Sequence, residues 1–167
     1  MQPTPAAIVV ESPSLRAGEP IPAVFTADGR NISPALTWRG LPDGTRELAL
    51  LFEDPDAPTP QPFVHWILYK IPATAAGVPE GVPIDPEAPM PPGMGAAVQG
   101  TNGFRRPIYR GPAPPPGKVH HYRFILFALD TALDVGPGLT KAELLEAMEG
   151  HVIGRGELVA TYERIRK

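Results

Sequence analysis

The sequence predicts a mainly β protein, a β-sandwich with one or two peripheral helices, and three observations support this. Dense apolar runs with aromatic and β-branched residues recur along the chain, as is typical of strands. Turns rich in proline and glycine separate these runs, with 24 prolines and 17 glycines among 167 residues. A helical pattern starts only near residue 140. The length is that of one ordinary domain, so we expect residues 1–167 to form a single domain.

The predicted strands follow one another along the chain. Ser-Pro and Gly-Glu-Pro turns separate the first two, and a Pro-Asp-Gly turn precedes the fourth. In order, the strands are Ile8–Val10, Ile21–Thr26, Leu36–Trp38, Glu47–Phe52, Phe63–Ile71, Val119–Leu129 and Glu157–Ile165. The fourth is nearly all apolar, as expected for a strand covered on both faces. The last would also fit a short helix.

Proline-rich segments and one helix complete the pattern. Pro72–Gly103 carries seven prolines and cannot be a helix, so it is predicted to be a long functional or flexible loop. A second proline-rich loop, Pro107–Gly117, is stiff enough to form a rigid wall. Thr140 and Glu143 form a capping box at the start of the predicted helix, and Gly150 ends it.

Composition excludes several classes of function. The net charge of −3 provides no basic surface for nucleic acid. No apolar run has the roughly 18–20 residues of a membrane span. The absence of cysteine excludes disulfides, thiolate nucleophiles and Cys-ligated zinc. The first residues do not resemble a secretory signal, so a cytoplasmic location is expected.

Two histidines stand near the starts of predicted strands, each beside a proline-rich loop. With a period of two, His65 shares a face with Ile67 and Tyr69, and His120 shares one with Tyr122. Both imidazoles could therefore open on a common pocket. The alternative is that each is a core or surface histidine whose ring is satisfied by backbone carbonyls.

Asp54 lies in phase with Phe52 at the end of a predicted strand, and Pro55 separates it from Asp56. A carboxylate here could hold the ring of His65 or His120 in one tautomer. The alternative is a turn in which both acids accept local backbone N–H groups. A metal ion bound by these acids and histidines is chemically possible, although their spacing matches no metal motif.

No enzyme signature is present. The chain has no Gly-x-Ser-x-Gly elbow, P-loop or dinucleotide fingerprint, so we expect no catalytic residue, no metal and no cofactor. Arg105, Arg106 and Arg110 could attract an anion to the mouth of the pocket. The alternative is that they are solvated loop cations.

Four blocks of the sequence resemble those of the phosphatidylethanolamine-binding proteins, and most closely the bacterial Raf kinase inhibitor-like branch of that family. The first block is Asn-Ile-Ser-Pro-Ala-Leu-Thr-Trp at positions 31–38. The others are Asp54–Pro58 with Phe63–Trp66, Tyr109–Gly117 with His120–Tyr122, and Glu143–Tyr162. Together they span most of the chain, and the two family signatures occur in the right order.

The resemblance implies a sandwich of two antiparallel sheets with a small pocket that holds phosphate, acetate or the head group of phosphoethanolamine. By position, the pocket residues implied are Asp54, Asp56, His65, His120 and Tyr122, with Ala113 and Pro114 as wall. A homodimer is also implied.

The sequence departs from the family pattern at three positions. Ala35 replaces a usual proline, Ala113 a frequent glycine or cysteine, and His121 a usual arginine. By alternation His121 points away from the face shared by His120 and Tyr122, so we choose His120 as the ligand-binding histidine.

The resulting functional hypothesis is a non-enzymatic binding protein for a small anion or phosphorylated ligand such as phosphoethanolamine. One alternative is a hydrolase or metal-assisted enzyme that uses the same Asp/His pocket. Another is a protein that docks or inhibits a kinase or protease through its long loops.

Overall fold

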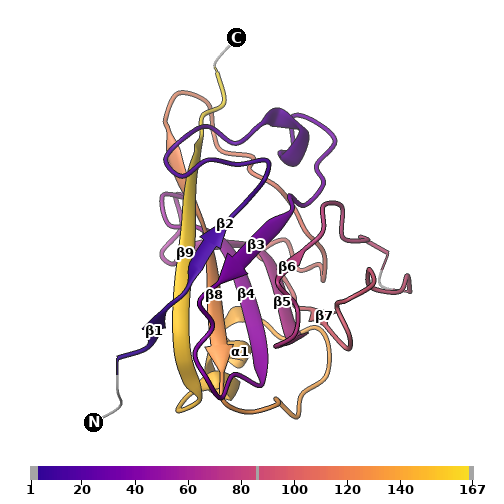
Figure 1. Ribbon diagram of the computed structural model, residues 1–167. Helices are drawn as coiled ribbons and strands as arrows, with labels where there is room; N and C mark the ends of the chain where they lie inside the picture. The colour runs from indigo at the N-terminus through magenta and orange to yellow at the C-terminus, as the bar shows by residue number, and fades with distance from the viewer. Residues whose placement is uncertain (1–3, 86, 166–167) are drawn as a thin grey trace.

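The computed structural model describes residues 4–85 and 87–165, whose strands form two β-sheets packed face to face (Figure 1). The six-stranded sheet contains, in spatial order, β1 (Ala6–Ala7), β9 (Val152–Tyr162), β8 (His120–Leu129), β4 (Glu47–Asp54), β5 (Phe63–Pro72) and β7 (Val98–Gln99). The three-stranded sheet contains β2 (Val9–Glu11), β3 (Leu36–Arg39) and β6 (Gly77–Val78). The predicted two-sheet sandwich is confirmed. Its strands pair antiparallel, apart from β1, which runs parallel to β9.

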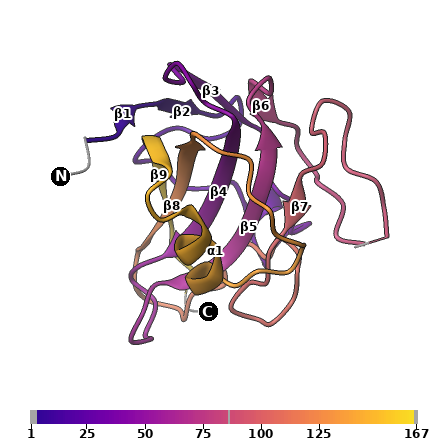
Figure 2. The same cartoon turned by 90° about the horizontal axis from the view of Figure 1, so that it is seen from below.

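The six-stranded sheet lies between two apolar layers. On one face it packs against the three-stranded sheet, and on the other the helix α1 (Lys141–Met148) covers it (Figure 2). Alternate residues of β4 serve the two layers, with Phe52 in the cluster between the sheets and Leu51 in the cluster under α1. The sequence prediction that this strand is buried on both faces is therefore confirmed.

The predicted capping box at the start of α1 is also present. The Glu143 backbone N–H donates to Thr140 Oγ1, and the Glu143 carboxylate accepts the Thr140 backbone N–H at 3.0 Å. In the described part of the chain, no helix combines the length and the apolar character needed to cross a membrane.

The prediction of a strand at Ile21–Thr26 is wrong. Residues Ala23–Phe25 form a 3₁₀ helix instead. The physical reason is Pro22, which has no N–H to donate to a strand ladder. Only an isolated bridge between Pro20 and Thr161 remains of the expected pairing within the described residues.

The last strand is a strand, as predicted, rather than a short helix, but it begins five residues earlier than expected, at Val152. The first residues of this strand include Gly154 and Gly156, which are not typical of strands, so the sequence pattern did not indicate its start. These glycines make room for the N-terminal segment, since a Cβ on Gly156 would lie 2.1 Å from the Ile8 carbonyl oxygen. The expected long loop Pro72–Gly103 also contributes the two-residue strands β6 and β7.

Two β-bulges change which way the side chains of β5 point. Phe52 pairs with Trp66 and Glu53 with Val64, so His65 is an extra residue without a partner on β4. A second irregularity surrounds Lys70, which has a φ of 57°.

The first bulge corrects one sequence prediction. His65 does not share a face with Ile67 and Tyr69, which pack under α1. Its ring instead contacts Phe52 and Tyr122 in the layer between the sheets. A bulge inserts one residue and so shifts the alternation on one side of it.

Candidate functional site

The candidate site is a cavity at the end of the six-stranded sheet where β4 ends and β5 and β8 begin. Because neighbouring strands are antiparallel, this end brings Asp54, His65 and His120 together from distant parts of the sequence. The cavity has a volume of about 240 Å³ and is lined by Asp54, Ala57, Pro58, Thr59, Phe63, His65, Phe104, Ala113, Pro114, Pro115, His120 and Tyr122.

Asp54 and His120 form a buried pair. His120 Nδ1 lies 2.6 Å from Asp54 Oδ2, and both side chains are less than 5% exposed. The other carboxylate oxygen of Asp54 accepts the backbone N–H of Asp56 at 2.8 Å. Asp54 is therefore held in place on both sides, and it fixes the orientation of the His120 ring.

His65 is tied to the loop that follows Phe104. Its Nδ1 lies 2.7 Å from the Arg110 carbonyl oxygen, and its own carbonyl accepts the Arg110 backbone N–H at 3.1 Å. Burial lowers the pKa of His65 to about 4, although the Arg110 carbonyl and the charge of Asp54 act in the opposite direction. The ring is therefore neutral near pH 7.

Tyr122 contributes a buried hydroxyl that has no partner at normal hydrogen-bond distance among the described residues, although it interacts with the nearby Asp54 carboxylate. Its ring centroid lies 5.5 Å from that of His65 and 6.3 Å from that of His120. Burial raises the pKa of Tyr122, and the nearby Asp54 carboxylate raises it further, so the phenol keeps its proton. A buried hydroxyl without a partner costs free energy, which a ligand or a water molecule in the cavity would recover.

The rim of the cavity is apolar. Phe63 and Phe104 meet edge to face with centroids 4.9 Å apart, and the Arg110 guanidinium lies 4.7 Å from the Phe104 ring centroid. Ala113 and Pro114, expected as wall residues, lie on the cavity lining. Sequence reasoning did not include either phenylalanine in the site. The available signal for Phe104 was an aromatic residue between Gly103 and Arg105 in an otherwise polar loop.

Asp56 is not among the residues that line the cavity. Its Oδ2 accepts the His121 backbone N–H at 2.7 Å and lies 2.8 Å from His121 Nδ1. Burial alone would raise the pKa of Asp56, but the hydrogen bonds from His121 hold it below its usual value. The His121 side chain is exposed beside β8, as the alternation argument predicted. A ligand-binding role for Asp56 stays a prediction.

The first sequence block has a structural role in this site. Asn31 Oδ1 accepts the Gly111 backbone N–H at 2.7 Å, and the Tyr109 hydroxyl donates to the Phe25 carbonyl at 2.7 Å. A Cβ on Gly111 would lie 2.1 Å from that same carbonyl oxygen, so the close approach requires glycine. These contacts fix the loop that holds His65.

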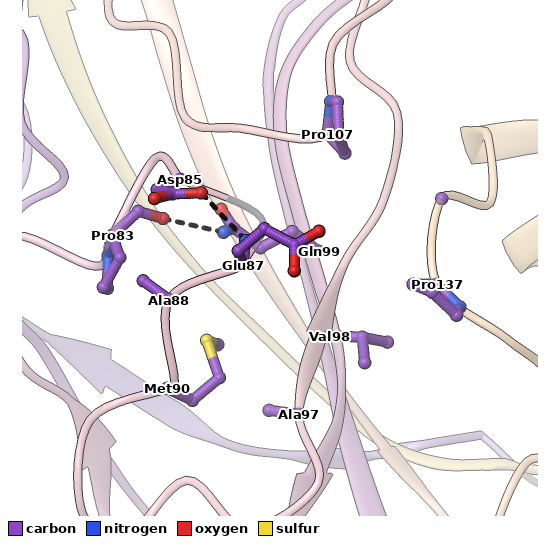
Figure 3. Close-up of a pocket in the computed structure, with 11 residues that line it drawn as sticks. Pro83, Asp85, Glu87, Ala88, Met90, Ala97, Val98, Gln99, Pro107 and Pro137 are labelled. Carbon is purple, nitrogen blue, oxygen red and sulfur yellow. Dashed lines mark hydrogen bonds between the residues drawn. The ribbon is translucent and has the colours of Figure 1, made fainter.

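A larger cavity of about 480 Å³ lies beside β7 (Figure 3). Its polar groups are either satisfied or exposed. Gln99 accepts the Trp66 indole N–H at 2.7 Å and donates to the Pro83 carbonyl at 2.9 Å. Asp85 accepts the Glu87 backbone N–H, and both carboxylates stand at the surface. We therefore place the candidate site at Tyr122 rather than here. Among the described residues, no group of three His, Asp or Glu side chains could hold a metal ion.

Residues 11–163 match the family model described as phosphatidylethanolamine-binding protein. The chain belongs to the phosphatidylethanolamine-binding protein family. Within it, a UPF0098 protein of Methanothermobacter thermautotrophicus is 47% identical over 144 residues, which cover 86% of this chain and 91% of that protein.

Solved structures agree with this family membership. The crystal structure of E. coli YbcL, a member of the mammalian PEBP family, has a TM-score of 0.85 and 33% identity, covering 94% of this chain and 98% of YbcL. A carboxypeptidase Y inhibitor, solved with its cognate proteinase, has a TM-score of 0.53 and 16% identity over 95% of this chain and 84% of the inhibitor. That second likeness concerns the fold alone.

Proposed function

We propose that this protein is a non-enzymatic binding protein whose pocket holds phosphate or a phosphorylated head group such as phosphoethanolamine. The observation that carries the proposal is the Tyr122 hydroxyl, which is buried without a partner at normal hydrogen-bond distance among the described residues and lines one cavity together with His65 and His120. Buried polar groups in folded proteins normally have partners, so a free one in a cavity points to a ligand.

The shape and lining of the cavity support a small polar group with an organic substituent. The polar groups His65, His120, Tyr122 and Asp54 lie together, whereas Phe63, Phe104 and the prolines form apolar walls. Pockets of this kind use a few convergent polar groups to fix a ligand that is otherwise held by apolar contacts. A head group would therefore place its phosphate against the histidines and its carbon chain along the apolar walls.

The test is a titration of the histidine rings by NMR with phosphate and with phosphoethanolamine. We expect saturable shifts of the His65 and His120 signals. The rings of His121 and His151 should not shift, because each is exposed and paired with its own aspartate, Asp56 and Asp130 respectively.

Two variants sharpen this test. His65→Ala should abolish binding without unfolding the protein, and His121→Arg should bind as the wild type does. No saturable shift with either ligand, or unchanged affinity in His65→Ala, would contradict the proposal.

A hydrolase is the second candidate function. The Asp54–His120 pair favours it, because a carboxylate bonded to Nδ1 is the arrangement that orients a general base. The hydroxyl side chains lining the cavity are those of Tyr122, whose pKa is raised, and Thr59, which donates to the Gln61 carbonyl. Neither is thereby activated as a nucleophile. Release of phosphate from phosphoethanolamine by the wild type, lost in His120→Ala, would favour the enzyme.

No contact among the described residues identifies a protein partner. Modulation of a kinase or protease therefore stays a prediction, and so does the homodimer.

A further inference from the structure

The hydrogen bonds of the two histidines fix which ring nitrogen carries the proton. His65 Nδ1 lies 2.7 Å from the Arg110 carbonyl oxygen, and a carbonyl oxygen can only accept. His120 Nδ1 lies 2.6 Å from Asp54 Oδ2, and an ionised carboxylate likewise only accepts. Both Nδ1 atoms therefore carry a hydrogen. In the neutral His65 ring Nε2 then has a lone pair, and within the described residues neither ring makes a hydrogen bond of normal length through Nε2.

The His65 lone pair creates a difficulty for a fully ionised anion. Its oxygens would face this lone pair and the Asp54 carboxylate, with the Tyr122 hydroxyl as a donor. No Arg or Lys is among the described residues that line the cavity, and the nearby Arg110 guanidinium lies over the Phe104 ring. Pairs of acceptors that face each other without a hydrogen between them leave both unsatisfied.

We propose that the pocket binds oxyanions in a proton-bearing form, as the monoanion of a phosphomonoester whose P–OH group donates to His65 Nε2. This inference rests on the proposed function and specifies its ligand class. In proton balance, a dianion in solution takes up one proton from water or buffer on binding, and no covalent bond in the ligand breaks. The Tyr122 hydroxyl then donates to an ionised oxygen of the ligand.

The titratable and charged groups that face the two histidine rings come from several elements. His65 is faced by Asp54 from β4, Tyr122 from β8 and Arg110 from the following loop. His120 is faced by Asp54 and Tyr122, and Tyr122 is influenced by Arg164 and Tyr162 at the end of β9. Burial lowers the pKa of His65 to about 4, so that ring does not supply the proton itself near pH 7.

The experiment compares phosphoethanolamine with ethanolamine O-sulfate by isothermal titration calorimetry of the wild-type protein. The sulfate ester has the same shape and the same charge as the phosphate monoanion, but it carries no proton. At pH 5.5, where most of the phosphoester is the monoanion, we expect the sulfate to bind at least about tenfold more weakly. At pH 7.5, measured in two buffers with different ionisation enthalpies, phosphoethanolamine should take up about one proton, because the second pKa of a phosphomonoester is about 6.

The pH dependence provides a second wild-type readout. Affinity for phosphoethanolamine should fall about tenfold for each pH unit above the second pKa of the ligand. Equal affinity for the two esters together with no proton uptake would overturn the inference and leave the proposed function standing. Failure of both ligands to bind would overturn the proposed function and the inference with it.

Two variants separate hydrogen-bond polarity from a general loss of affinity. His65→Gln introduces an amide N–H that can donate, so the preference for the phosphate ester should shrink to about threefold or less. Tyr122→Phe removes a donor that serves both ligands, so both affinities should fall while the preference remains. An unchanged preference in a folded His65→Gln protein would overturn the assignment of that Nε2 as the discriminating acceptor.

Discussion

At the scale of single residues, the pocket depends on the hydrogen bonds that orient two imidazole rings. His120 is oriented by a carboxylate and His65 by a backbone carbonyl, and both rings are buried. The groups bonded to Nδ1 decide the tautomer of each ring. They therefore decide whether its other nitrogen, Nε2, can donate to a ligand or accept from it. Tyr122 differs from both because its hydroxyl makes no hydrogen bond of normal length within the described residues and can either donate or accept.

The burial of His65 predicts a pH dependence of stability. Its pKa is about 4 in the folded protein and about 6.5 when unperturbed, so between these values the unfolded chain binds more protons. The free energy of unfolding therefore falls as the pH falls, by about 2 kcal/mol between pH 7 and pH 5 from this residue. Urea denaturation at the two pH values, in buffers without phosphate or carboxylate, measures it.

The matched variant for this prediction is His65→Gln, which cannot titrate. Its loss of stability between pH 7 and pH 5 should be smaller than that of the wild type by about the same 2 kcal/mol. Equal losses in the two proteins would show that His65 titrates normally in the folded state.

Sequence periodicity predicted some of these residues and not others. Asp54, His120 and Tyr122 lie in regular parts of β4 and β8, where a period of two correctly places them on one face. His65 reaches that same face for a reason the pattern does not contain, because the bulge at this position shifts the alternation. Phe104 comes from an irregular loop, for which no periodicity applies.

At the scale of elements, a buried ion cluster fastens α1 to the sheet directly behind the pocket. Glu53 is fully buried, and its two oxygens each lie 2.6 Å from a cation, Arg123 Nη2 and Lys141 Nζ. Glu53 adjoins Asp54 on β4, and Arg123 adjoins Tyr122 on β8. The cluster therefore ties together the helix and the two strands that carry pocket residues.

Removal of one cation should expose the cost of the buried carboxylate. We expect Arg123→Met to lower the free energy of unfolding by about 3 kcal/mol, since it leaves Glu53 with one partner in a buried setting. The control is Arg155→Met, which breaks the exposed pair with Glu157 and should cost less than about 1 kcal/mol. Urea denaturation measures both, and similar costs would show that burial does not strengthen the Glu53 cluster.

The elements themselves were predicted where local chemistry decides them. The central strands and the capped helix follow from dense apolar runs and from the Thr140–Glu143 box. The 3₁₀ helix at Ala23–Phe25 and the glycine-containing start of β9 were missed. Their structure is decided by a missing N–H at Pro22 and by close contact of Gly156 with a distant segment.

At the scale of the whole molecule, the strand ends of the six-stranded sheet and the proline-rich walls meet at one end of the sandwich. The loop before β8 and the loop after β4 each supply cavity walls, whereas the segment between β6 and β7 lies away from this end, at the β7 edge (Figure 1). Because the cavity is built from segments that are distant in the sequence, ligand binding should stabilise the whole fold and not one loop alone.

A saturating ligand should raise the melting temperature. At a free concentration of one hundred times Kd, a ligand that binds only the folded state adds about 2.7 kcal/mol. For a chain of this size that corresponds to a rise of about 5–10 °C. Thermal denaturation with phosphoethanolamine measures it in the wild type, and His65→Ala should show no rise. An equal rise in both proteins would place the ligand elsewhere.

The pairing of Asp54 with His120 joins positions 66 residues apart in the chain. No short segment contains both halves of the site, so the pocket cannot be transferred to another scaffold as a single loop. It comes into being only when β4 and β8 have found their register. Ligand binding therefore indicates that β4 and β8, which come from distant parts of the sequence, are correctly paired.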